Sequence, residues 1–488
     1  MLSSDYRYNV AMTRRIAVVG SGPSAWSAFK TLESLHVGCC TIIILDAAVR
    51  ESTSSISPTL ASKKKLGSSH MYAGNSGGIT FSNPSNFSLA NGGFSTVWGA
   101  GIRLWDSKVL EKYCHIDDIY DAAKELLDNL PYSGNSGTIN IPEKFMVKET
   151  PRPPNSNDFR EIVGSVSKNV CSFETALALD VVTNLKCVGC GNCLTGCPYG
   201  AIFDSGNAFD KYFSAHKSRR KQVYVERISS NQEGLMVWGH LRNGESFNEL
   251  FDEIHLCAGA IGTPLILMKS NLISDQQITV LDSQAFYFIG LKFFRKTNSP
   301  SFALSQVTLS STDTNKIDFK ASLYRSNIET RLRISQLLKS KLKFDIPIPS
   351  CIDRVLFLGI GFLDSGNSGI IEVRKIDKEI FVRPIIAGRK RVKVALQQIR
   401  KYLSVKGFHV IPGIFIKPLP GLGFHSGGGL PLGSTHVDDF GRLRSDVRIR
   451  ISDVSILRSI PAGAHTFTSM ALVSSIIKSE YENSNHGA

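Results

Sequence analysis

The apolar and polar positions near the start of the chain predict a strand, a helix and a second strand, in that order. Residues 16–19 form a short apolar run rich in β-branched side chains, which is typical of a buried strand. Residues 24–35 are predicted to form a helix, and residues 41–45 are predicted to form a second buried strand. This order of elements is typical of a parallel α/β sheet.

The turn between this strand and helix reads GSGPSA and has the spacing GxGxxA. Gly20 permits a tight turn, Gly22 lets a diphosphate approach the backbone, and the small Ala25 lets helix and strand pack closely. The second strand ends at Asp46, about where such units hold a ribose hydroxyl. The alternative is a glycine turn in an ordinary α/β protein. The pattern predicts a dinucleotide-binding site formed by Gly20, Gly22, Pro23, Ser24, Ala25 and Asp46.

The next part of the chain is predicted to be irregular apart from one helix. Residues 50–88 are rich in Ser, Gly and Asn, which predicts long loops. Residues 107–130 carry apolar positions at helical spacing. Residues 131–154 are rich in proline and glycine, so we expect a cap or a linker there.

The centre of the chain is predicted to hold mainly strands. The expected strands are residues 223–227, 235–241, 253–256, 355–363, 369–373 and 380–386. The turn at residues 364–368 separates the first two of the later strands. We expect these later strands to form a mostly antiparallel sheet in a second domain.

Two amphipathic helices are expected in this second domain. The apolar stripe of residues 391–405 consists of Val392, Ala395, Leu396, Ile399, Tyr402 and Leu403. Residues 331–343 are basic on one face, with Ile334 among the apolar positions of the other. A basic amphipathic helix such as residues 331–343 either packs on a core or makes peripheral contact with a membrane surface, and both interpretations stay open.

Composition predicts a soluble globular protein of two or three domains. The chain has 488 residues, of which 42% are hydrophobic and 20% are charged. No window approaches the roughly eighteen consecutive apolar residues of a membrane span. Residues 1–12 lack the apolar core of a signal peptide, so we expect an N-terminal tail, or a translation start at Met12, and a cytoplasmic location.

The formal net charge is +14, and the basic residues are spread along the chain. The ordinary interpretation is a solvated surface. The alternatives are attraction to an anionic substrate, an anionic lipid surface or an acidic electron-transfer partner. Nucleic acid is not expected as a partner, because no basic motif with interleaved aromatic residues is present.

Four of the ten cysteines lie within eleven residues: Cys187, Cys190, Cys193 and Cys197. With Pro198 they have the spacing C-x2-C-x2-C-x3-C-P, which holds iron–sulfur clusters in bacterial ferredoxins. The fourth cysteine of such a run ligates the other cluster in two-cluster ferredoxins. Here the loop closes differently, or Cys171 or Cys257 completes a 4Fe-4S site, or a 3Fe-4S cluster forms. Zinc fits the spacing less well, and cysteines without a metal are the remaining interpretation.

A second glycine-rich segment, NGGFSTVWGA, covers residues 91–100. Its small residues would let a ligand approach the backbone, and Trp98 would pack over a flat ring system. The residues expected at this contact are Gly92, Gly93, Ser95, Trp98 and Gly99. A glycine loop beside a core tryptophan is the alternative.

Three further segments place chemistry-bearing groups near predicted helix starts or glycines. Residues 257–264 read CAGAIGTP, so a strand ends near Ala258 and Gly259 and a helix is expected to start near Pro264. His425 precedes three glycines, and His465 precedes an apolar helix. Either histidine alone is often a packing or capping group. Two of them beside glycines, in a chain with a dinucleotide motif, favour acid–base chemistry.

These separated motifs together resemble the glucose–methanol–choline (GMC) oxidoreductases, flavoenzymes that oxidise alcohols. The resemblance implies an α/β fold with a discontinuous, Rossmann-like FAD-binding domain and a substrate domain whose mostly antiparallel sheet is flanked by helices. The implied boundaries are 13–110, 180–275 and 418–488 for the FAD-binding domain, 111–179 and 276–417 for the substrate-binding or cap domain, and 187–198 for the cysteine-rich loop.

The resemblance also implies roles for individual residues. His425 resembles the catalytic base and His465 its partner, and Asp453 resembles an acid near the FAD diphosphate and ribityl chain. Contacts with FAD are further implied for Ala258, Gly259, His465 and Thr466. Two positions depart from the family pattern, because HSGGG stands where HxxGT is commoner and Asp46 stands where Glu is usual. The first departure leaves the substrate geometry open.

The resemblance implies FAD-dependent oxidation of a CH–OH group in a sugar or another alcohol. A histidine takes the hydroxyl proton and flavin N5 takes the hydride. Some sugar dehydrogenases of this type carry an iron–sulfur cluster, and a cluster favours a dehydrogenase with a protein or quinone acceptor over an oxidase. The alternatives are a flavin reductase or isomerase fed by the cluster, and a non-catalytic electron-transfer subunit.

Overall fold

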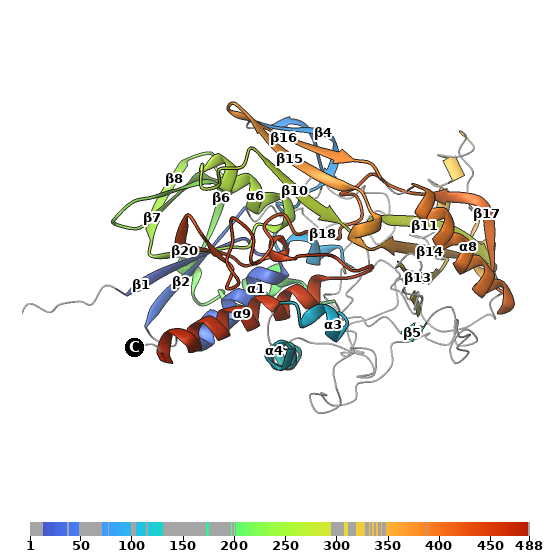
Figure 1. Cartoon of the computed structure of the whole chain (residues 1–488), viewed down its shortest axis with the longest axis horizontal. Helices are drawn as coiled ribbons and strands as arrows, with labels where there is room; N and C mark the ends of the chain where they lie inside the picture. Colours follow the sequence, from blue (N-terminus) through green and yellow to red (C-terminus); the bar gives the residue numbers. More distant parts are fainter. Residues whose placement is uncertain are drawn as a thin grey trace, which may run out of the picture.

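The computed structural model shows an α/β molecule with three sheets in the part of the chain that it describes (Figure 1). The described residues are 13–36, 39–47, 71–76, 78–98, 104–113, 116–129, 172–174, 197, 200, 202–293, 307–310, 319–326, 331, 334–335, 338–339, 343, 348–387 and 389–486. Among these residues, no helix is both long enough and apolar enough to cross a membrane.

The largest sheet has eight strands in the order β19-β20-β9-β1-β2-β6-β7-β8. Its strands are β1 (Arg14–Val19), β2 (Cys40–Asp46), β6 (Arg220–Ser230), β7 (Leu235–Leu241), β8 (Ser246–Phe251), β9 (Glu253–Leu256), β19 (Arg442–Leu443) and β20 (Asp446–Ile451). The pairs β20–β9, β9–β1, β1–β2 and β2–β6 are parallel. The carboxyl ends of β20, β9, β1 and β2 therefore meet at one edge of the sheet, where ligands of α/β proteins bind.

Four longer helices accompany this sheet: α1 (Pro23–Leu35), α4 (Ile116–Asn129), α6 (Gly259–Lys269) and α9 (Thr466–His486). In Figure 1, α1 and α9 lie together below β1 and β2, with α4 beneath α9 and α6 above. Buried polar contacts join α1 to α9, because Ser27 Oγ donates to the Met470 carbonyl oxygen at 2.6 Å. The predicted strand–helix–strand unit at the start of the chain is confirmed.

Shorter helical segments are η1 (Gly93–Thr96), α3 (Ser107–Leu110), α5 (Ser205–Tyr212), η6 (Lys217–Arg219), η7 (Ser350–Arg354), η8 (Ser365–Asn367) and η9 (Val454–Ile456).

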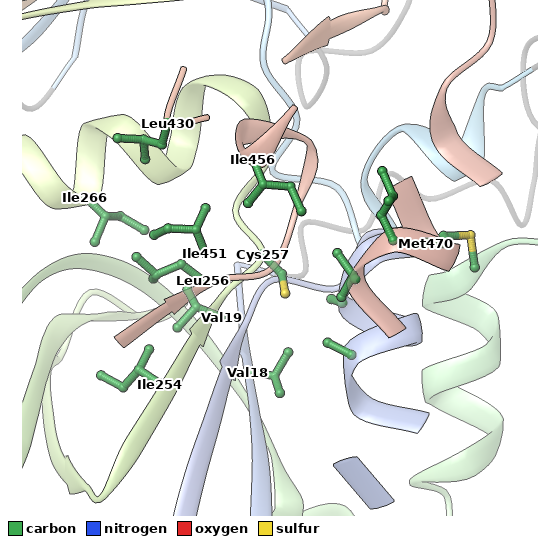
Figure 2. Packing of buried hydrophobic residues seen from close by; sticks show 14 of the residues in the cluster. Val18, Val19, Ile254, Leu256, Cys257, Ile266, Leu430, Ile451, Ile456 and Met470 are labelled. Atoms are coloured by element: carbon green, nitrogen blue, oxygen red, sulfur yellow. The ribbon is translucent and has the colours of Figure 1, made fainter. Parts of the chain in front are cut away.

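The main core lies among the parallel strands and the longer helices. Figure 2 shows part of it, with the buried side chains of Val18, Val19, Ile254, Leu256, Cys257, Ile266, Leu430, Ile451, Ile456 and Met470. Burial of each large aliphatic side chain contributes about 1.5–3 kcal/mol, so this core fixes the strand ends that carry the loops described below.

Two six-stranded sheets form the rest of the molecule, in the orders β18-β10-β15-β16-β4-β3 and β17-β11-β14-β13-β12-β5. The first contains β3 (Met71–Ser76), β4 (Ile79–Asn86), β10 (Gln277–Asp282), β15 (Ile370–Ile376), β16 (Glu379–Ile385) and β18 (Ser426–Gly427). The second contains β5 (Ser172–Glu174), β11 (Ala285–Leu291), β12 (Val307–Ser310), β13 (Phe319–Arg325), β14 (Leu356–Leu363) and β17 (His409–Ile416). Every pair is antiparallel except β16 with β4, so the predicted mostly antiparallel arrangement is confirmed.

Helix α8 (Arg389–Val405) covers one face of the sheet that contains β13. Its predicted stripe is buried at Val392, Ala395, Ile399, Tyr402 and Leu403. These side chains pack with buried phenylalanines of the sheet, including Phe288 and Phe319. In the other amphipathic segment, Ile334 is buried against the same sheet, which favours the core interpretation at that position.

Three details of the predicted secondary structure are wrong. Residues 50–88 contain β3 and β4, because β4 gains a partner in β16 that lies far along the chain and cannot be read from local propensity. The later predicted strands belong to two sheets, so residues 364–368 join β14 of one sheet to β15 of the other. Helix α6 begins at Gly259, with Pro264 inside it instead of in its first turn.

Candidate active site

A cavity of about 410 Å³ lies at the carboxyl ends of β1, β2 and β9. Its lining includes residues from every glycine-containing segment that the sequence singled out, together with both predicted histidines. Side chains from β11, β13 and β14 complete it. The cavity therefore lies between the parallel sheet and the antiparallel sheet that α8 covers.

The turn between β1 and α1 is built for close approach of a ligand to the backbone. Gly20 has φ +122°, and a Cβ there would lie 2.3 Å from the carbonyl oxygen of Cys257, so no other residue fits. Gly22 precedes the first turn of α1, whose amides have no side-chain cap, and a Cβ on Gly22 would meet nothing within 4 Å among the described residues. The positive end of α1 therefore faces open space beside the cavity.

Asp46 lies at the end of β2 and lines the cavity. Its Oδ2 is 2.7 Å from Nη2 of Arg220, while Oδ1 is buried and has no hydrogen-bond partner among the described residues. An unpaired buried carboxylate oxygen is costly unless a ligand donates to it. The position and chemistry of this oxygen fit a ribose hydroxyl.

Buried serines tie the second glycine-rich segment to the first. The Gly92 amide donates to Ser21 Oγ at 3.0 Å, and Ser205 Oγ donates to the Ser21 carbonyl oxygen at 2.8 Å. Ser205 also lies 2.9 Å from Ser95 Oγ. Ser205 begins α5, where sequence reasoning assigned nothing; the only local signal is Asp204, whose carboxylate caps that helix.

The two glycines of this segment pack closely, for different reasons. A Cβ on Gly92 would lie 2.4 Å from Asp204 Oδ1, whereas Gly93 faces Gly22, whose Cα would lie 3.4 Å from an added Cβ. Gly92 is therefore required by protein packing, and Gly93 keeps the space beside the α1 turn free. Gly99 lies outside the described residues.

Trp98 connects the cavity to the segment that follows the cysteine-rich loop. Its ring lines the cavity, and its Nε1 donates to the carbonyl oxygen of Phe203 at 2.9 Å. Cys197 is half-buried and packs at the edge of the main core. Cys187, Cys190 and Cys193 lie outside the described residues, so the geometry of the predicted metal site stays a prediction.

Asp453 binds the start of α6 to the C-terminal segment. Its Oδ2 accepts from the Gly259 amide at 2.7 Å and from Thr263 Oγ1 at 2.6 Å, and its Oδ1 accepts from the Ser455 amide at 2.8 Å. Burial raises the pKa of Asp453, and these hydrogen bonds oppose that shift. The carboxylate thus holds Ala258 and Gly259 at the cavity wall.

The structure brings the two predicted histidines together at the cavity. The ring centroids of His425 and His465 are 5.3 Å apart, with the rings at 74°. On its other side, the His425 ring lies 4.3 Å from the ring of Phe362. Both Nδ1 atoms are buried and have no hydrogen-bond partner within the described part of the chain.

Burial lowers the pKa of both imidazoles. The pKa of His425 lies well below its usual value because of burial and, second, the neighbouring His465. Burial lowers the pKa of His465 to about 4, although the Ser426 carbonyl opposes this shift. Nε2 of His465 is 3.2 Å from that carbonyl oxygen, so we assign the hydrogen to Nε2 and the lone pair to Nδ1. Both rings are then neutral at pH 7, and each offers a lone pair.

A buried carboxyl group positions the segment that carries His425. Asp282 accepts hydrogen bonds from Ser426 Oγ at 2.8 Å and from the Gly421 amide at 3.1 Å. The next residue, Ser283, donates its amide to the His425 carbonyl oxygen at 2.8 Å. Burial raises the pKa of Asp282 to about 6, and both hydrogen bonds oppose the rise.

The wall opposite the glycine turns was not predicted from the sequence. It is formed partly by β13, from which Lys320, Ser322 and Tyr324 line the cavity. The intervening positions Phe319, Ala321 and Leu323 are fully buried on the α8 side. This period-two alternation in FKASLYR was the available signal, although it does not say what the polar face contacts.

Taken together, the groups at the cavity fit a flavin dinucleotide better than a smaller ligand. The uncapped helix start beside Gly22 suits a diphosphate, and the unpaired Asp46 oxygen suits a ribose. The histidine pair lies across the same cavity, which is where a redox-active ring would have to meet a substrate. The arrangement can bind a dinucleotide and accept a proton beside it.

Comparisons with known proteins agree with this geometry. Among solved structures, the chain is similar to pyridoxine 4-oxidase from Mesorbium loti, with a TM-score of 0.65, 13% identity, and 96% of this chain and 99% of that chain covered. It is also similar to a formate oxidase variant from Aspergillus oryzae RIB40 whose FAD modification was examined, with a TM-score of 0.62, 12% identity, and 96% and 99% covered. At these identities the likeness establishes the fold alone, and the predicted fold class is confirmed.

A family model described as a 4Fe-4S binding domain matches residues 181–203. The match covers all four predicted ligand cysteines of the cysteine-rich loop. A comparison with curated proteins finds no match.

Proposed function

We propose that this chain is an FAD-dependent oxidoreductase that oxidises a CH–OH group in a sugar or another alcohol. One observation carries the proposal: two neutral, buried histidines, whose Nδ1 atoms have no hydrogen-bond partner among the described residues, lie at a cavity whose opposite end suits a dinucleotide. The predicted roles of these residues follow from the same resemblance that correctly predicted the fold.

FAD would be held by groups at the cavity that can still donate or accept a hydrogen bond. The amides of Ser24 and Ala25 would donate to the diphosphate, since Pro23 has no N–H, and Asp46 Oδ1 would accept a hydrogen bond from a ribose hydroxyl. Gly93 and Trp98 would flank the ring system, with Gly259 and Thr466 nearby at the cavity wall. When bound, FAD supplies the acceptor for the hydride that leaves the alcohol carbon.

The chain's own residues supply the proton chemistry. An alcohol C–H is a poor hydride donor until the O–H proton leaves, so His425 accepts that proton on an imidazole nitrogen. His465 lies beside the same oxygen, and it would stabilise the developing negative charge once its hydrogen moves from Nε2, where the Ser426 carbonyl oxygen accepts it, to Nδ1. The low pKa of both rings keeps them unprotonated at neutral pH, which is the form a base needs. The antiparallel sheet excludes water and shapes the substrate end through Tyr324 and Phe362.

Cys187, Cys190, Cys193 and Cys197 would hold a 4Fe-4S or 3Fe-4S cluster, which is supported by the match to the 4Fe-4S binding domain. A cluster accepts electrons singly, so it favours a protein or quinone acceptor and a dehydrogenase over an oxidase. Trp98 lines the cavity and donates to the carbonyl oxygen of Phe203, which follows this loop in the sequence.

An anaerobic absorption spectrum with iron and sulfide analysis tests the proposal. Flavin bands with broad visible absorption and stoichiometric iron are expected from protein purified without oxygen. Flavin bands without iron would remove the cluster and favour a simple alcohol oxidase or dehydrogenase. Protein that takes up no flavin on reconstitution would overturn the proposal.

A further inference from the structure

A second group of metal-ligating side chains lies away from the cavity, where α1 ends and β2 begins. His36, Cys39 and Cys40 each offer one ligand atom, and these three atoms lie within 4.8 Å of one another. Nδ1 of His36 is 3.7 Å from Sγ of Cys39, and the two sulfur atoms are 3.8 Å apart. None of the three residues lines the cavity or belongs to the cysteine-rich loop.

These separations match those around a tetrahedral zinc ion. With Zn–S of about 2.3 Å, Zn–N of about 2.05 Å and tetrahedral angles, two sulfur ligands lie about 3.8 Å apart and a sulfur and a nitrogen about 3.6 Å apart. We propose that His36, Cys39 and Cys40 form a binding site for a divalent, borderline-soft cation of the zinc class. Two thiolates and an imidazole are ligands that such a cation prefers, and the half-buried setting leaves its fourth position to water.

The backbone and a neighbouring helix hold the ligands in place. The Cys39 amide donates to the His36 carbonyl oxygen at 3.2 Å, and the His36 amide donates to the Leu32 carbonyl oxygen at 2.9 Å. The ring of Tyr481 in α9 packs edge-on against the His36 imidazole, with centroids 4.9 Å apart. The side chains therefore need little rearrangement to coordinate an ion.

The charges around the site favour a cation with thiolate ligands. The last turn of α1 contains no basic residue, so the negative end of its dipole meets His36 without a positive partner from that turn. Arg14 pairs with Cys40 in the register of β1 and β2, and its guanidinium forms an ion pair with Glu253. The ion would be neutralised by two thiolates and would join α1 to β2.

A disulfide between the two cysteines is the competing state. Adjacent residues have Cα atoms about 3.8 Å apart, which is below the usual 4.4–6.8 Å range of disulfides. Such a bond would be strained and easily reduced, so the dithiol form needed for the metal is favoured in a reducing compartment.

Zinc binding to the reduced full-length protein, measured by competition with a chromophoric chelator, tests this site. The cysteine-rich loop also contains thiols, so the protein is prepared with iron and sulfide bound, and each variant is compared with the parent. We expect the double variant Cys39→Ser, Cys40→Ser to bind one zinc equivalent fewer per chain. Cys351→Ser, which removes another exposed cysteine, serves as the matched control and should bind as the parent does.

A milder variant keeps the test decisive if the double variant folds poorly. His36→Asn removes one ligand at the end of α1 and should weaken zinc binding by at least about 10-fold, since even indirect metal partners cost 10–100-fold when lost. In the double variant, the thiolate-to-Co²⁺ charge-transfer band should lose the intensity that two thiolate ligands contribute. Equal zinc stoichiometry and affinity in the parent and the variants would overturn the proposal, as would a Cys39–Cys40 disulfide in protein purified without oxygen. Neither result depends on FAD or on alcohol oxidation.

Discussion

Buried polar groups at the two ends of the parallel strands differ in whether they have hydrogen-bond or ion-pair partners in the protein. At the carboxyl ends of β1, β2 and β9, glycine turns open a cavity, and buried polar atoms of Asp46, His425 and His465 lack protein partners among the described residues. Near the amino ends, Glu253 begins β9 and is surrounded by cations and hydrogen-bond donors. One end therefore leaves polar groups available, and the other satisfies them internally.

The cluster around Glu253 shows how complete that internal pairing is. Its Oε1 lies 2.8 Å from Nε2 of His255 and 3.0 Å from Nη1 of Arg450, and its Oε2 pairs with Arg14. Arg450 continues to Glu480 of α9. Because unpaired buried polar groups are costly, a fold keeps them only where a ligand completes them. The comparison assigns stability to the Glu253 end and chemistry to the histidine end.

The largest expected effect comes from removing a group at the chemical end. We predict that His425→Ala slows reduction of the bound flavin by about 10²–10⁴-fold, which is the usual size of acid–base catalysis. Stopped-flow absorbance at the flavin band measures this rate. His409→Ala, on the exposed side of β17, should leave the rate unchanged. An unchanged rate in His425→Ala would show that the histidine end is structural as well.

Breaking the satisfied end should instead damage stability. Glu253→Gln leaves Arg450 buried with one anion fewer, so we predict a loss of about 3 kcal/mol in the free energy of unfolding. Glu249→Gln removes a partner of Arg15 and Lys221 nearer the surface and should cost less than about 1 kcal/mol. Chemical denaturation of FAD-loaded protein measures both, and equal losses would contradict the distinction.

The pH dependence of unfolding sharpens the same prediction. Burial alone would raise the pKa of Glu253, but the hydrogen bond from His255 and the charges of Arg450 and Arg14 lower it to about 2. A carboxyl group with a lowered pKa stabilises the fold at pH values above its ordinary pKa of about 4.5. This contribution is lost as the pH falls toward 2. The parent should therefore lose stability more steeply than Glu253→Gln between about pH 5 and pH 2.

The sequence predicted the cofactor end better than the substrate end, for a physical reason. The turn at Gly20 needs a backbone with φ +122°, and a demand of this kind leaves a short glycine motif in the sequence. The contact of Ser205 with Ser21, and the presence of Tyr324 and His465 in the lining of one cavity, arise only when segments far apart in the chain meet. No local pattern specifies those meetings.

The same limit explains the errors in the fold. Strand β4 has the sequence ITFSNPSN, which alternates only over its first four residues and then contains a proline, and it is flanked by β3 and β16. Helix α8, by contrast, has a complete apolar stripe and was predicted almost to its ends. Elements that carry their own apolar face can be predicted, whereas those stabilised by a distant partner cannot.

Two glycines in the turn between β1 and α1 should respond differently to replacement by alanine. Gly22→Ala adds a methyl group that would meet no described residue within 4 Å, so we predict a normal fold with FAD binding weakened by about 10-fold, or about 1.4 kcal/mol. Gly20→Ala places a Cβ 2.3 Å from the Cys257 carbonyl oxygen at φ +122°, so it should lower the stability of the FAD-free protein as well. Flavin fluorescence titration and thermal unfolding separate the two effects. If Gly22→Ala bound FAD as tightly as the parent, the diphosphate would not lie at this turn.

Asp282 is intermediate between the two kinds of environment, because it is buried and hydrogen-bonded but forms no ion pair among the described residues, although the charge of Lys417 acts on it. Burial raises its pKa to about 6, so the folded state holds a proton that the unfolded state has released above about pH 4. The unfolding free energy of the parent, taken relative to that of Asp282→Asn, should therefore decrease as pH rises from about 4 to 6. The lowered pKa values of His425 and His465 contribute the opposite slope, and they contribute it equally to both proteins. The amide keeps an oxygen acceptor for Ser426 or Gly421, so the flavin reduction rate should change by less than about 10-fold, since the His425 segment moves little. Asp275→Asn, at an exposed pair with His436, is the control for the pH slope. A parent slope that Asp282→Asn retains would assign that proton to another group, and a rate loss as large as that of His425→Ala would mean that Asp282 does more than hold the histidine segment in place.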